Sequence, residues 1–304
     1  MTRHLLTLDS IGRDGILVNL ELATHLKAIK GLAQDTLAGG RLGLIFDKPS
    51  TRTRVSFEAA AWSLGMLPIT LRPDELQLGR GETVADTARV LSRYLSALAI
   101  RTFEQSRVEE LARHSTIPII NALTDDHHPC QALADVMTIQ EEFGEFDGLR
   151  VAFIGDGNNV CHSLIFLAAR LGVNLRIATP ASYAPAADVL ADAKRVAKET
   201  RAKIELFTNP VEAVNGVQAV YTDSWTSMGF EAEEKMRRQV FKSYQVNRKL
   251  MEQAGEGAVF MHCLPAHRGQ EVTDEVLDGP TSVVLQQSEN RMYVQKAILH
   301  ALFT

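Results

Sequence analysis

A short polar segment at residues 50–54 combines the side chains that bind phosphate. Its sequence, Ser50-Thr51-Arg52-Thr53-Arg54, brings three hydroxyls and two guanidiniums together. Arginine binds phosphate oxygens in a planar, often bidentate geometry. The segment follows an apolar run and opens a helical pattern, and the unpaired N–H groups at the beginning of a helix attract anions. The pattern favours a phosphate site, although an ordinary capped helix with solvated arginines would have the same sequence.

A histidine and a glutamine at the beginning of a second helical pattern could hold a planar amide. In His127-His128-Pro129-Cys130-Gln131, proline suits the first helical position, which makes His128 the capping residue. Histidine is not a preferred cap, so its imidazole is available for another role. Together, an imidazole N–H and the Gln131 amide could bind an O=C–NH2 group. A buried histidine that bonds only to backbone is the plain alternative.

The segment Gly155–Asn159 links a predicted strand to a helix, as a dinucleotide-binding turn does. However, Val160 stands where such a turn has its third glycine, and the next strand ends in Thr179-Pro180 rather than in an acidic residue. The sequence therefore argues against NAD. The two asparagines of the segment could instead bind a carboxylate or an amine.

Two further segments follow predicted strands directly. Asp223, at the head of Asp223–Gly229, places a carboxylate at a strand end, which suits an ammonium group; a helix-capping aspartate is the alternative. In His262-Cys263-Leu264-Pro265, a thiol lies beside an imidazole. Neighbours on a strand point to opposite faces, so His262 cannot easily activate Cys263 as a nucleophile. A buried, structural cysteine is equally consistent with this pattern.

The elements that would position these residues alternate between short apolar runs and helical patterns. Such alternation predicts an α/β protein with parallel sheets covered on both faces. The predicted strands are Arg41–Asp47, Ala97–Arg101, Ile117–Asn121, Arg150–Ile154, Asn174–Thr179, Ala219–Thr222, Ala258–His262 and Ser282–Leu285. The first predicted helix begins after Pro49, has Phe57, Ala60, Ala61 and Leu64 at helical spacing, and is closed by Gly65. The other predicted helices are Pro129–Phe143, Val160–Leu171, Ala187–Thr200 and Ser288–Leu302.

The pattern restarts after Gly144–Gly148, which predicts a domain boundary there. We expect two doubly wound parallel-sheet domains with a cleft between them, and ligands beyond the carboxyl ends of the strands. The first domain would comprise residues 1–144, with the C-terminal helix 288–304 packing back on it. The second would comprise residues 145–287.

Composition excludes several classes of protein. The chain has 304 residues, a net charge of −5 and no long basic run, which argues against nucleic acid as a partner. No apolar stretch reaches the ~20 residues that span a bilayer, and residues 1–8 lack a signal pattern. The three cysteines, Cys130, Cys161 and Cys263, are far apart in sequence, so we expect no disulfide and a cytoplasmic location.

The motifs, taken in order along the chain, resemble those of the ornithine carbamoyltransferase family. They are STRTR, HPCQ, DGNN, D-x-x-x-S-M-G, HCLP and ENR, and they extend along nearly the whole chain. STRTR and HPCQ resemble the general transcarbamoylase pattern, whereas S-M-G with HCLP resembles the ornithine branch. The resemblance implies transfer of the carbamoyl group of carbamoyl phosphate to the side-chain amine of L-ornithine. It further implies direct attack by the amine, no covalent intermediate, no metal, no cofactor, and a homotrimer or a multiple of trimers.

The resemblance also assigns roles to individual residues. It implies that carbamoyl phosphate is bound by Ser50, Thr51, Arg52, Thr53, Gln77, Arg101, His128, Gln131, Cys263, Leu264 and Arg291. It implies that ornithine is bound by Asn159, Asp223, Ser227 and Met228. The expected catalytic residues are Arg101, His128, Asp223 and Cys263. Among the residues implied to bind carbamoyl phosphate, Gln77 would reach the site of a neighbouring subunit.

Four other interpretations stay open. The nearest is a transcarbamoylase that acts on another amine, such as putrescine or lysine. A hydrolase with Cys263 as nucleophile and a non-catalytic ligand-binding paralogue are two more. The fourth is a zinc protein, although no standard zinc spacing fits its candidate ligands His127, His128, Cys130, His262 and Cys263.

Overall fold

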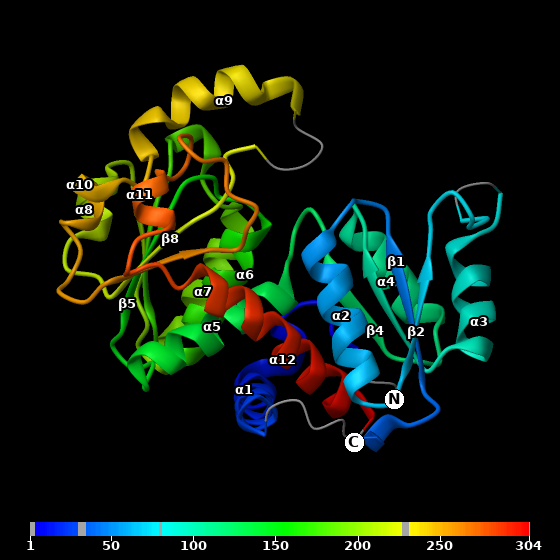
Figure 1. The fold of residues 1–304 in the computed structure, drawn as a ribbon. Helices are drawn as coiled ribbons and strands as arrows, with labels where there is room; N and C mark the ends of the chain where they lie inside the picture. The colour runs from blue at the N-terminus through cyan, green and yellow to red at the C-terminus, as the bar shows by residue number, and fades with distance from the viewer. Residues whose placement is uncertain (1–3, 30–34, 79–80, 227–230, 304) are drawn as a thin grey trace. The chain divides into compact units, whose positions relative to one another are not determined.

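A computed structural model describes residues 4–29, 35–78, 81–226 and 231–303 of the chain (Figure 1). Contacts between residues divide it into two compact units, Met1–Leu133 with Asn290–Thr304, and Ala134–Glu289. Each unit is built on one parallel sheet, as predicted. The domain boundary at residue 144 and the cleft stay predictions.

The first unit contains a four-stranded parallel sheet in the order β2-β1-β3-β4. Apolar residues of α3 and α4 pack with Ile45, Ile100 and Ile119 of the strands into one core. The strands are β1 (Arg41–Phe46), β2 (Leu67–Leu71), β3 (Ala97–Arg101) and β4 (Ile119–Leu123). The helices are α1 (Gly12–Ala28), α2 (Thr51–Ser63), α3 (Val84–Tyr94) and α4 (Gln105–His114), with 3-10 turns η1 (Asp9–Ile11) and η2 (Asp35–Leu37).

The second unit contains a five-stranded parallel sheet in the order β7-β6-β5-β8-β9. Its strands are β5 (Arg150–Ile154), β6 (Asn174–Ala178), β7 (Ile204–Phe207), β8 (Ala219–Thr222) and β9 (Val259–His262). Its helices are α6 (Asn159–Leu171), α7 (Ala187–Thr200), α8 (Pro210–Val214), α9 (Glu234–Phe241), α10 (Arg248–Met251) and α11 (Asp274–Leu277), with 3-10 turns η3 (Ala181–Tyr183), η4 (Glu231–Glu233) and η5 (Lys242–Tyr244). Two helices have residues in both units: α5 (Pro129–Phe143) and α12 (Val284–Phe303).

The central strands of the second sheet are buried on both faces. Ala152 and Ile154 join one apolar core, whereas Phe153, between them in β5, stacks on Tyr221 with ring centroids 5.6 Å apart. Continuous apolar runs such as Val151–Ile154 are therefore explained by burial on both sides, which is usual for parallel sheets.

The predicted helix at Pro129–Phe143 and the strands at Ala97–Arg101 and Ala219–Thr222 are confirmed. The predicted strand Ser282–Leu285 is wrong. Ser282 forms only an isolated bridge with Phe260, and α12 already begins at Val284. A run of four residues is too short to separate a strand from the first turn of a helix.

The C-terminal helix packs on the first unit, as expected. Residues from Asn290 onward belong to that unit, and Lys27 Nζ of α1 donates a 2.6 Å hydrogen bond to Asn290 Oδ1. The beginning of α12, up to Glu289, belongs to the second unit. No helix within the described ranges is both long and apolar enough to cross a membrane.

Each sheet has a topological switch point, at which the order in which successive strands join the sheet changes direction. In the first sheet β2 lies on one side of β1 and β3 and β4 lie on the other; in the second, β6 and β7 lie on one side of β5, and β8 and β9 on the other. Ligands of such sheets bind beyond the carboxyl ends of the two strands at the change of direction. These two strands are β1 and β3 in the first sheet, and β5 and β8 in the second.

Candidate active site

In the first unit, the predicted phosphate segment lies where β1 and β3 end. Ser50 caps α2, and its Oγ accepts a hydrogen bond from the Thr53 backbone N–H at 3.2 Å. Arg101, the last residue of β3, donates from Nη1 to the same Ser50 Oγ at 3.4 Å. A capped helix terminus and a guanidinium therefore converge on one hydroxyl. Both groups favour an anion at that point.

Thr53 and Arg291 connect α2 to the C-terminal helix. The Arg291 Nη2 donates to Thr53 Oγ1 at 2.5 Å, and both side chains are buried. Because Thr53 Oγ1 accepts this bond, its own hydroxyl hydrogen can be donated to a ligand. The predicted residue of the ENR motif is thus joined to the STRTR segment, although they are far apart in sequence.

His128 is buried beside two arginines. Burial, then the charges of Arg291 and Arg101, holds the pKa of His128 well below its usual 6.5. The ring is therefore neutral at pH 7 and can donate one N–H without carrying charge. Gln131, also buried, lies in the first turn of α5, where its backbone N–H donates to the His128 carbonyl at 3.2 Å. The predicted capping position of His128 is confirmed, since the Ala132 N–H also donates to its carbonyl.

A partly buried ionic network joins residues that follow β1, β3 and β4. Lys48 is buried, pairs with Asp125 and lies 4.3 Å from the Phe103 ring centroid. Asp47 Oδ2 accepts from Thr102 Oγ1 at 2.6 Å and from the Arg107 guanidinium at 2.9 Å. Sequence reasoning missed these residues because only the adjacency of the strands brings them together.

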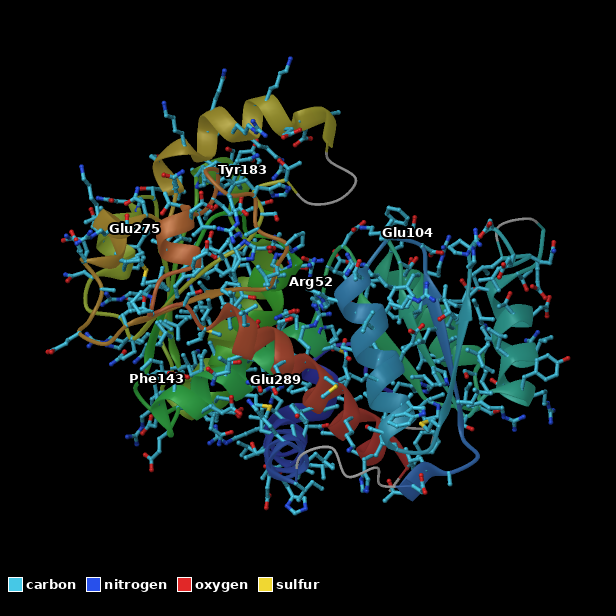
Figure 2. The ribbon with its side chains drawn as sticks, viewed as in Figure 1. Arg52, Glu104, Phe143, Tyr183, Glu275 and Glu289 are labelled. Carbon is cyan, nitrogen blue, oxygen red and sulfur yellow. The ribbon has the colours of Figure 1, made fainter. Side chains whose placement is uncertain are left out.

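The remaining predicted residues of the first unit differ in their surroundings. Arg52 is half-buried in the first turn of α2, where Figure 2 labels it, and Thr51 is exposed. Arg54 pairs instead along its own helix, with Arg54 Nε 2.9 Å from Glu58 Oε1. Gln77 is exposed, and no contact of the described residues joins it to the phosphate cluster.

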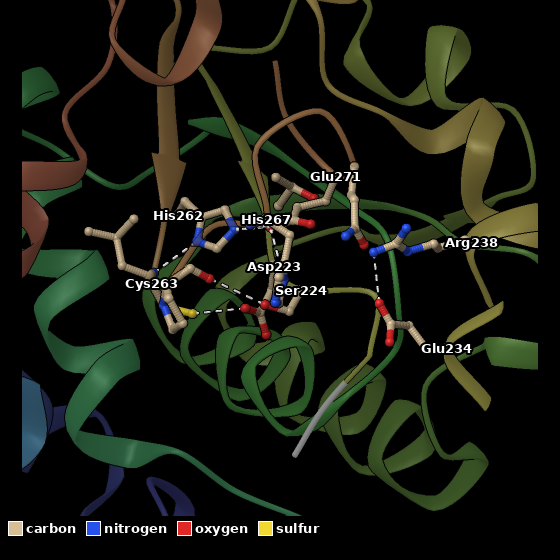
Figure 3. A network of polar contacts seen from close by, with 12 residues as sticks. Asp223, Ser224, Glu234, Arg238, His262, Cys263, His267 and Glu271 are labelled. Carbon is tan, nitrogen blue, oxygen red and sulfur yellow. Dashed lines mark hydrogen bonds and ion pairs between the residues drawn. The ribbon is translucent and has the colours of Figure 1, made fainter. Parts of the chain in front are cut away.

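In the second unit, Asp223 lies at the carboxyl end of β8 and accepts two side-chain hydrogen bonds. Asn158 Nδ2 donates to Asp223 Oδ2 at 2.7 Å, and the Cys263 thiol donates to Asp223 Oδ1 at 3.0 Å (Figure 3). Asn158 also caps α6, because its Oδ1 accepts from the N–H groups of Val160 and Cys161. Asp223 therefore bonds to Asn158, the neighbour of the predicted Asn159.

The two ring nitrogens of His262 bond to Leu264 and Glu271 rather than to Cys263. The Leu264 N–H donates to His262 Nδ1 at 2.8 Å, and His262 Nε2 lies 3.2 Å from Glu271 Oε1 (Figure 3). Since Nδ1 accepts, Nε2 carries the proton and donates to the buried Glu271. The bond to Leu264 supports its left-handed backbone, with φ of 57°. That conformation costs a non-glycine residue about 1–2 kcal/mol.

A second buried network lies under β8 and β9. Gln287 Oε1 accepts from the His262 backbone N–H at 2.9 Å, and Gln287 Nε2 donates to Asp135 Oδ1 at 2.6 Å. The Tyr221 hydroxyl donates to Asp135 Oδ2 at 3.1 Å. Burial and the neighbouring Asp135 raise the pKa of Tyr221, so its hydroxyl remains a donor. The network fixes the strand ends that carry Asp223 and Cys263.

Within the described residues, Asp223, His262 and Cys263 have possible metal-ligand atoms within 4.8 Å of one another. Their hydrogen bonds do not suit a metal. Both ring nitrogens of His262 are engaged, and the Cys263 thiol donates to Asp223. The thiol also has no bond to the imidazole, so the Cys–His nucleophile pair is not formed. Ser227 and Met228, predicted to bind ornithine, lie outside the described residues.

Two family models match almost the whole chain. Residues 3–141 match "Aspartate/ornithine carbamoyltransferase, carbamoyl-P binding domain". Residues 147–302 match "Aspartate/ornithine carbamoyltransferase, Asp/Orn binding domain".

Full-length relatives show the same similarity. The chain is 52% identical to an ornithine carbamoyltransferase of Bacillus cereus (strain 03BB102), covering 99% of this chain and 95% of the relative. It is similar to the structure of ornithine carbamoyltransferase from Pyrococcus furiosus, with 49% identity, a TM-score of 0.95, and 98% and 96% of the two chains covered. It is also similar to the anabolic ornithine carbamoyltransferase of Campylobacter jejuni, with 38% identity, a TM-score of 0.94, and 99% of each chain covered.

Proposed function

The chain belongs to the aspartate/ornithine carbamoyltransferase family, and we propose that it transfers the carbamoyl group of carbamoyl phosphate to the side-chain amine of L-ornithine. The products are L-citrulline and phosphate. One observation carries the proposal: each sheet has polar side chains of opposite character at its change of direction. The first set is cationic and rich in hydroxyls, and the second is centred on a carboxylate.

The proposed carbamoyl phosphate domain comprises residues 1–144 and 288–304. Ser50, Thr53 and the backbone at the beginning of α2 bind the phosphate, together with Arg52, Arg101 and Arg291. The bonds from Arg101 to Ser50 and from Arg291 to Thr53 support this role, because they direct two guanidiniums toward the helix terminus. His128 and Gln131 bind the carbamoyl group as neutral donors, which the lowered pKa of His128 supports.

The proposed ornithine domain comprises residues 145–287. Asp223 attracts the ammonium charge of the substrate. Asn158 and Cys263 fix the orientation of the Asp223 carboxylate. Asn159, Ser227 and Met228 complete the amino-acid site, and Leu264 lies beside the reacting amine. A carboxylate held by two donors keeps its geometry when the ligand arrives, which reduces the cost of ordering the site.

The proposed reaction begins with a neutral amine. Its free pKa is about 10, so the ammonium group must first lose a proton; Asp223, with Cys263 nearby, orients the group and accepts that proton. The amine nitrogen attacks the carbonyl carbon and forms a C–N bond. Thr53, Arg101 and His128 donate to the developing oxyanion, an effect typically worth ~100–1,000-fold in turnover per donor. The C–O bond to phosphate then breaks, the attacking nitrogen passes one proton to the leaving phosphate, and the arginines stabilise that phosphate.

A homotrimer is proposed for the assembly. Two apolar residues one heptad apart on α2, Val55 and Trp62, are 56% and 72% exposed, and Leu67 of the edge strand β2 is 59% exposed. Exposed apolar groups of this size are typical of surfaces that pack on another chain. Gln77 is proposed to reach the neighbouring subunit's site. Sedimentation of the Trp62→Lys variant as a smaller species would support this assembly. The cytoplasmic location stays a prediction.

The test is a citrulline-forming assay with carbamoyl phosphate and a series of amines. L-Ornithine should give the highest kcat/KM, with putrescine and L-lysine much lower. A higher kcat/KM with either of those amines would reassign the substrate, and no carbamoyl transfer to any amine would overturn the proposed chemistry.

A further inference from the structure

Arg237 of α9 is buried and contacts residues from four parts of the second unit. Its Nη1 donates to Asp156 Oδ2 at 2.7 Å and to the Trp225 carbonyl at 2.9 Å. Its Nε donates to Glu233 Oε2 at 2.9 Å. The Tyr183 ring covers the guanidinium, 4.7 Å from Cζ to the ring centroid. Nothing in the motif pattern of the sequence pointed to this residue, which lies in a run of charged helix positions.

The two partners of Arg237 Nη1 belong to the two segments that form the amine site. Asp156 lies in the loop after β5, two residues before Asn158. Trp225 lies in the segment after β8, two residues after Asp223. Asn158 and Asp223 are themselves joined by the 2.7 Å bond. One guanidinium thus connects the same two segments a second time.

The aromatic residues around Arg237 restrict the same segment. The Trp225 ring is buried and stacks on Phe241, with centroids 5.9 Å apart and planes inclined by 19°. Phe241 is also on α9, one turn after Arg237. The helix therefore holds Trp225 both by its carbonyl oxygen and by its ring.

We propose that Arg237 is a positioning residue for the amine substrate, because its guanidinium holds the loop after β5 in register with the segment after β8. The inference rests on the proposed function, since it concerns how Asn158 and Asp223 are set for ornithine. Arg237 bonds to neither of these residues, so it acts through Asp156 and Trp225. A planar guanidinium can satisfy three acceptors in fixed directions, which a lysine ammonium cannot do with the same geometry.

The charges around Asp156 agree with this role. Burial raises the pKa of Asp156 to about 6, the Arg237 guanidinium opposes that rise, and the nearby Asp223 and Glu233 add to it. Arg237 therefore neutralises a second carboxylate close to Asp223. An unpaired Asp156 would compete for the ammonium group of the substrate.

The experiment compares Arg237→Met, Arg237→Lys and Asp156→Asn with a matched control, Arg238→Met. Arg238 is the next residue of the same helix, is exposed, and among the described residues pairs along α9, with Nη2 2.8 Å from Glu234 Oε1 (Figure 3). Displacing reacting groups by about 1 Å costs about 100-fold in rate. We expect Arg237→Met to lose about that factor in kcat/KM for ornithine, mostly through KM. Carbamoyl phosphate affinity, measured by calorimetry, should change less than about twofold because sites without shared partners are independent.

The conservative variants separate positioning from charge. Arg237→Lys keeps the charge and should recover only a small part of the loss, and Asp156→Asn should raise the KM for ornithine without changing α9. Thermal unfolding and circular dichroism identify any variant that fails to fold; Arg237→Lys and Asp156→Asn then carry the test. Wild-type ornithine KM in Arg237→Met, or full activity in Arg237→Lys, would overturn the inference.

A second readout keeps this test separate from the proposed function. Hydrogen exchange should become faster in Arg237→Met at the amides of Val160 and Cys161, which Asn158 caps, and should be unchanged in Arg238→Met. If the wild-type protein made no citrulline, the proposed function would fail and hydrogen exchange would decide the positioning role. Unchanged exchange at those amides would refute it.

Discussion

Replacing Arg291 by methionine should both weaken the binding of carbamoyl phosphate and raise the pKa of His128. The substitution keeps most of the apolar length of the side chain but removes the guanidinium that donates to Thr53 at 2.5 Å. Arg291 is also the charge that acts most strongly on His128, ahead of Arg101. A single variant therefore tests whether these buried groups form one anion site.

The magnitude follows from the kind of bond that is lost. A hydrogen bond to a charged group contributes about 1.5–3 kcal/mol. Since about 1.4 kcal/mol is tenfold, the Kd for carbamoyl phosphate should rise about 10- to 150-fold. The control is Arg54→Met, whose guanidinium is exposed and pairs with Glu58. That variant should bind carbamoyl phosphate within about twofold of wild type, because salt screens exposed charges.

The pKa of His128 should move in a defined direction. It is lowered by burial, Arg291 and Arg101, so removal of Arg291 should raise the pKa toward 6.5. Cys130, another titratable group near Arg291, has its pKa raised to about 12 by burial and stays neutral. Below pH 6.5 the unfolded chain binds a proton at His128, whereas the folded protein, in which the pKa is lowered, does not. The free energy of unfolding therefore decreases as the pH falls below 6.5. Arg291→Met should reduce that acid-side loss.

Calorimetry with carbamoyl phosphate and an NMR titration of the His128 ring, assigned with a His128→Gln variant, measure both effects. An unchanged Kd would show that Arg291 does not contact the ligand. A pKa of His128 that stays at its wild-type value would show that the two side chains are not neighbours. Either result would refute the arrangement on which the phosphate site depends.

Three other substitutions have separate outcomes. In Gly157→Ala, the new Cβ would lie 2.3 Å from the Pro185 backbone nitrogen, so the variant should lose about 1–3 kcal/mol of unfolding free energy in urea melts; an unchanged midpoint would contradict the close approach. Tyr221→Phe leaves the buried Asp135 without one donor and should cost about 1–3 kcal/mol in the same melts, with kcat little changed. Cys263→Ala removes a donor to the site carboxylate and should lower kcat/KM about 10- to 100-fold; complete loss of activity would instead favour a thiol nucleophile.

The strands that carry the motifs could be predicted from the sequence because each is a short apolar run that ends in a polar cluster. Arg101 and Asp223 were placed at strand ends in this way, and both lie there. Parallel strands end at the same edge of a sheet, so the grouping of these clusters follows from the fold class. The half-buried β2 and the short β7 were not predicted, because neither forms a continuous apolar run.

Residues that act through tertiary contacts could not be predicted. Arg237 looks like any basic residue of an exposed helix, and Glu271 becomes notable only because it is fully buried beside His262. The omission of Asn158, which bonds to Asp223 and precedes the predicted Asn159, reflects a different limit. A helix start is uncertain by about one or two residues in sequence, and the capping residue and its neighbour point in different directions.

The two sheets build separate cores, one around Ile100 and one around Phe260, and each carries its own polar cluster. Mutations in the loops after β5 and β8 can therefore alter the proposed amine site without disturbing the strand register of the sheet that carries the proposed phosphate site. Selection can act on the proposed amine site while the proposed phosphate site is inherited unchanged. The family descriptions, with one carbamoyl-P binding domain and one domain that serves Asp or Orn, fit such a history of divergence.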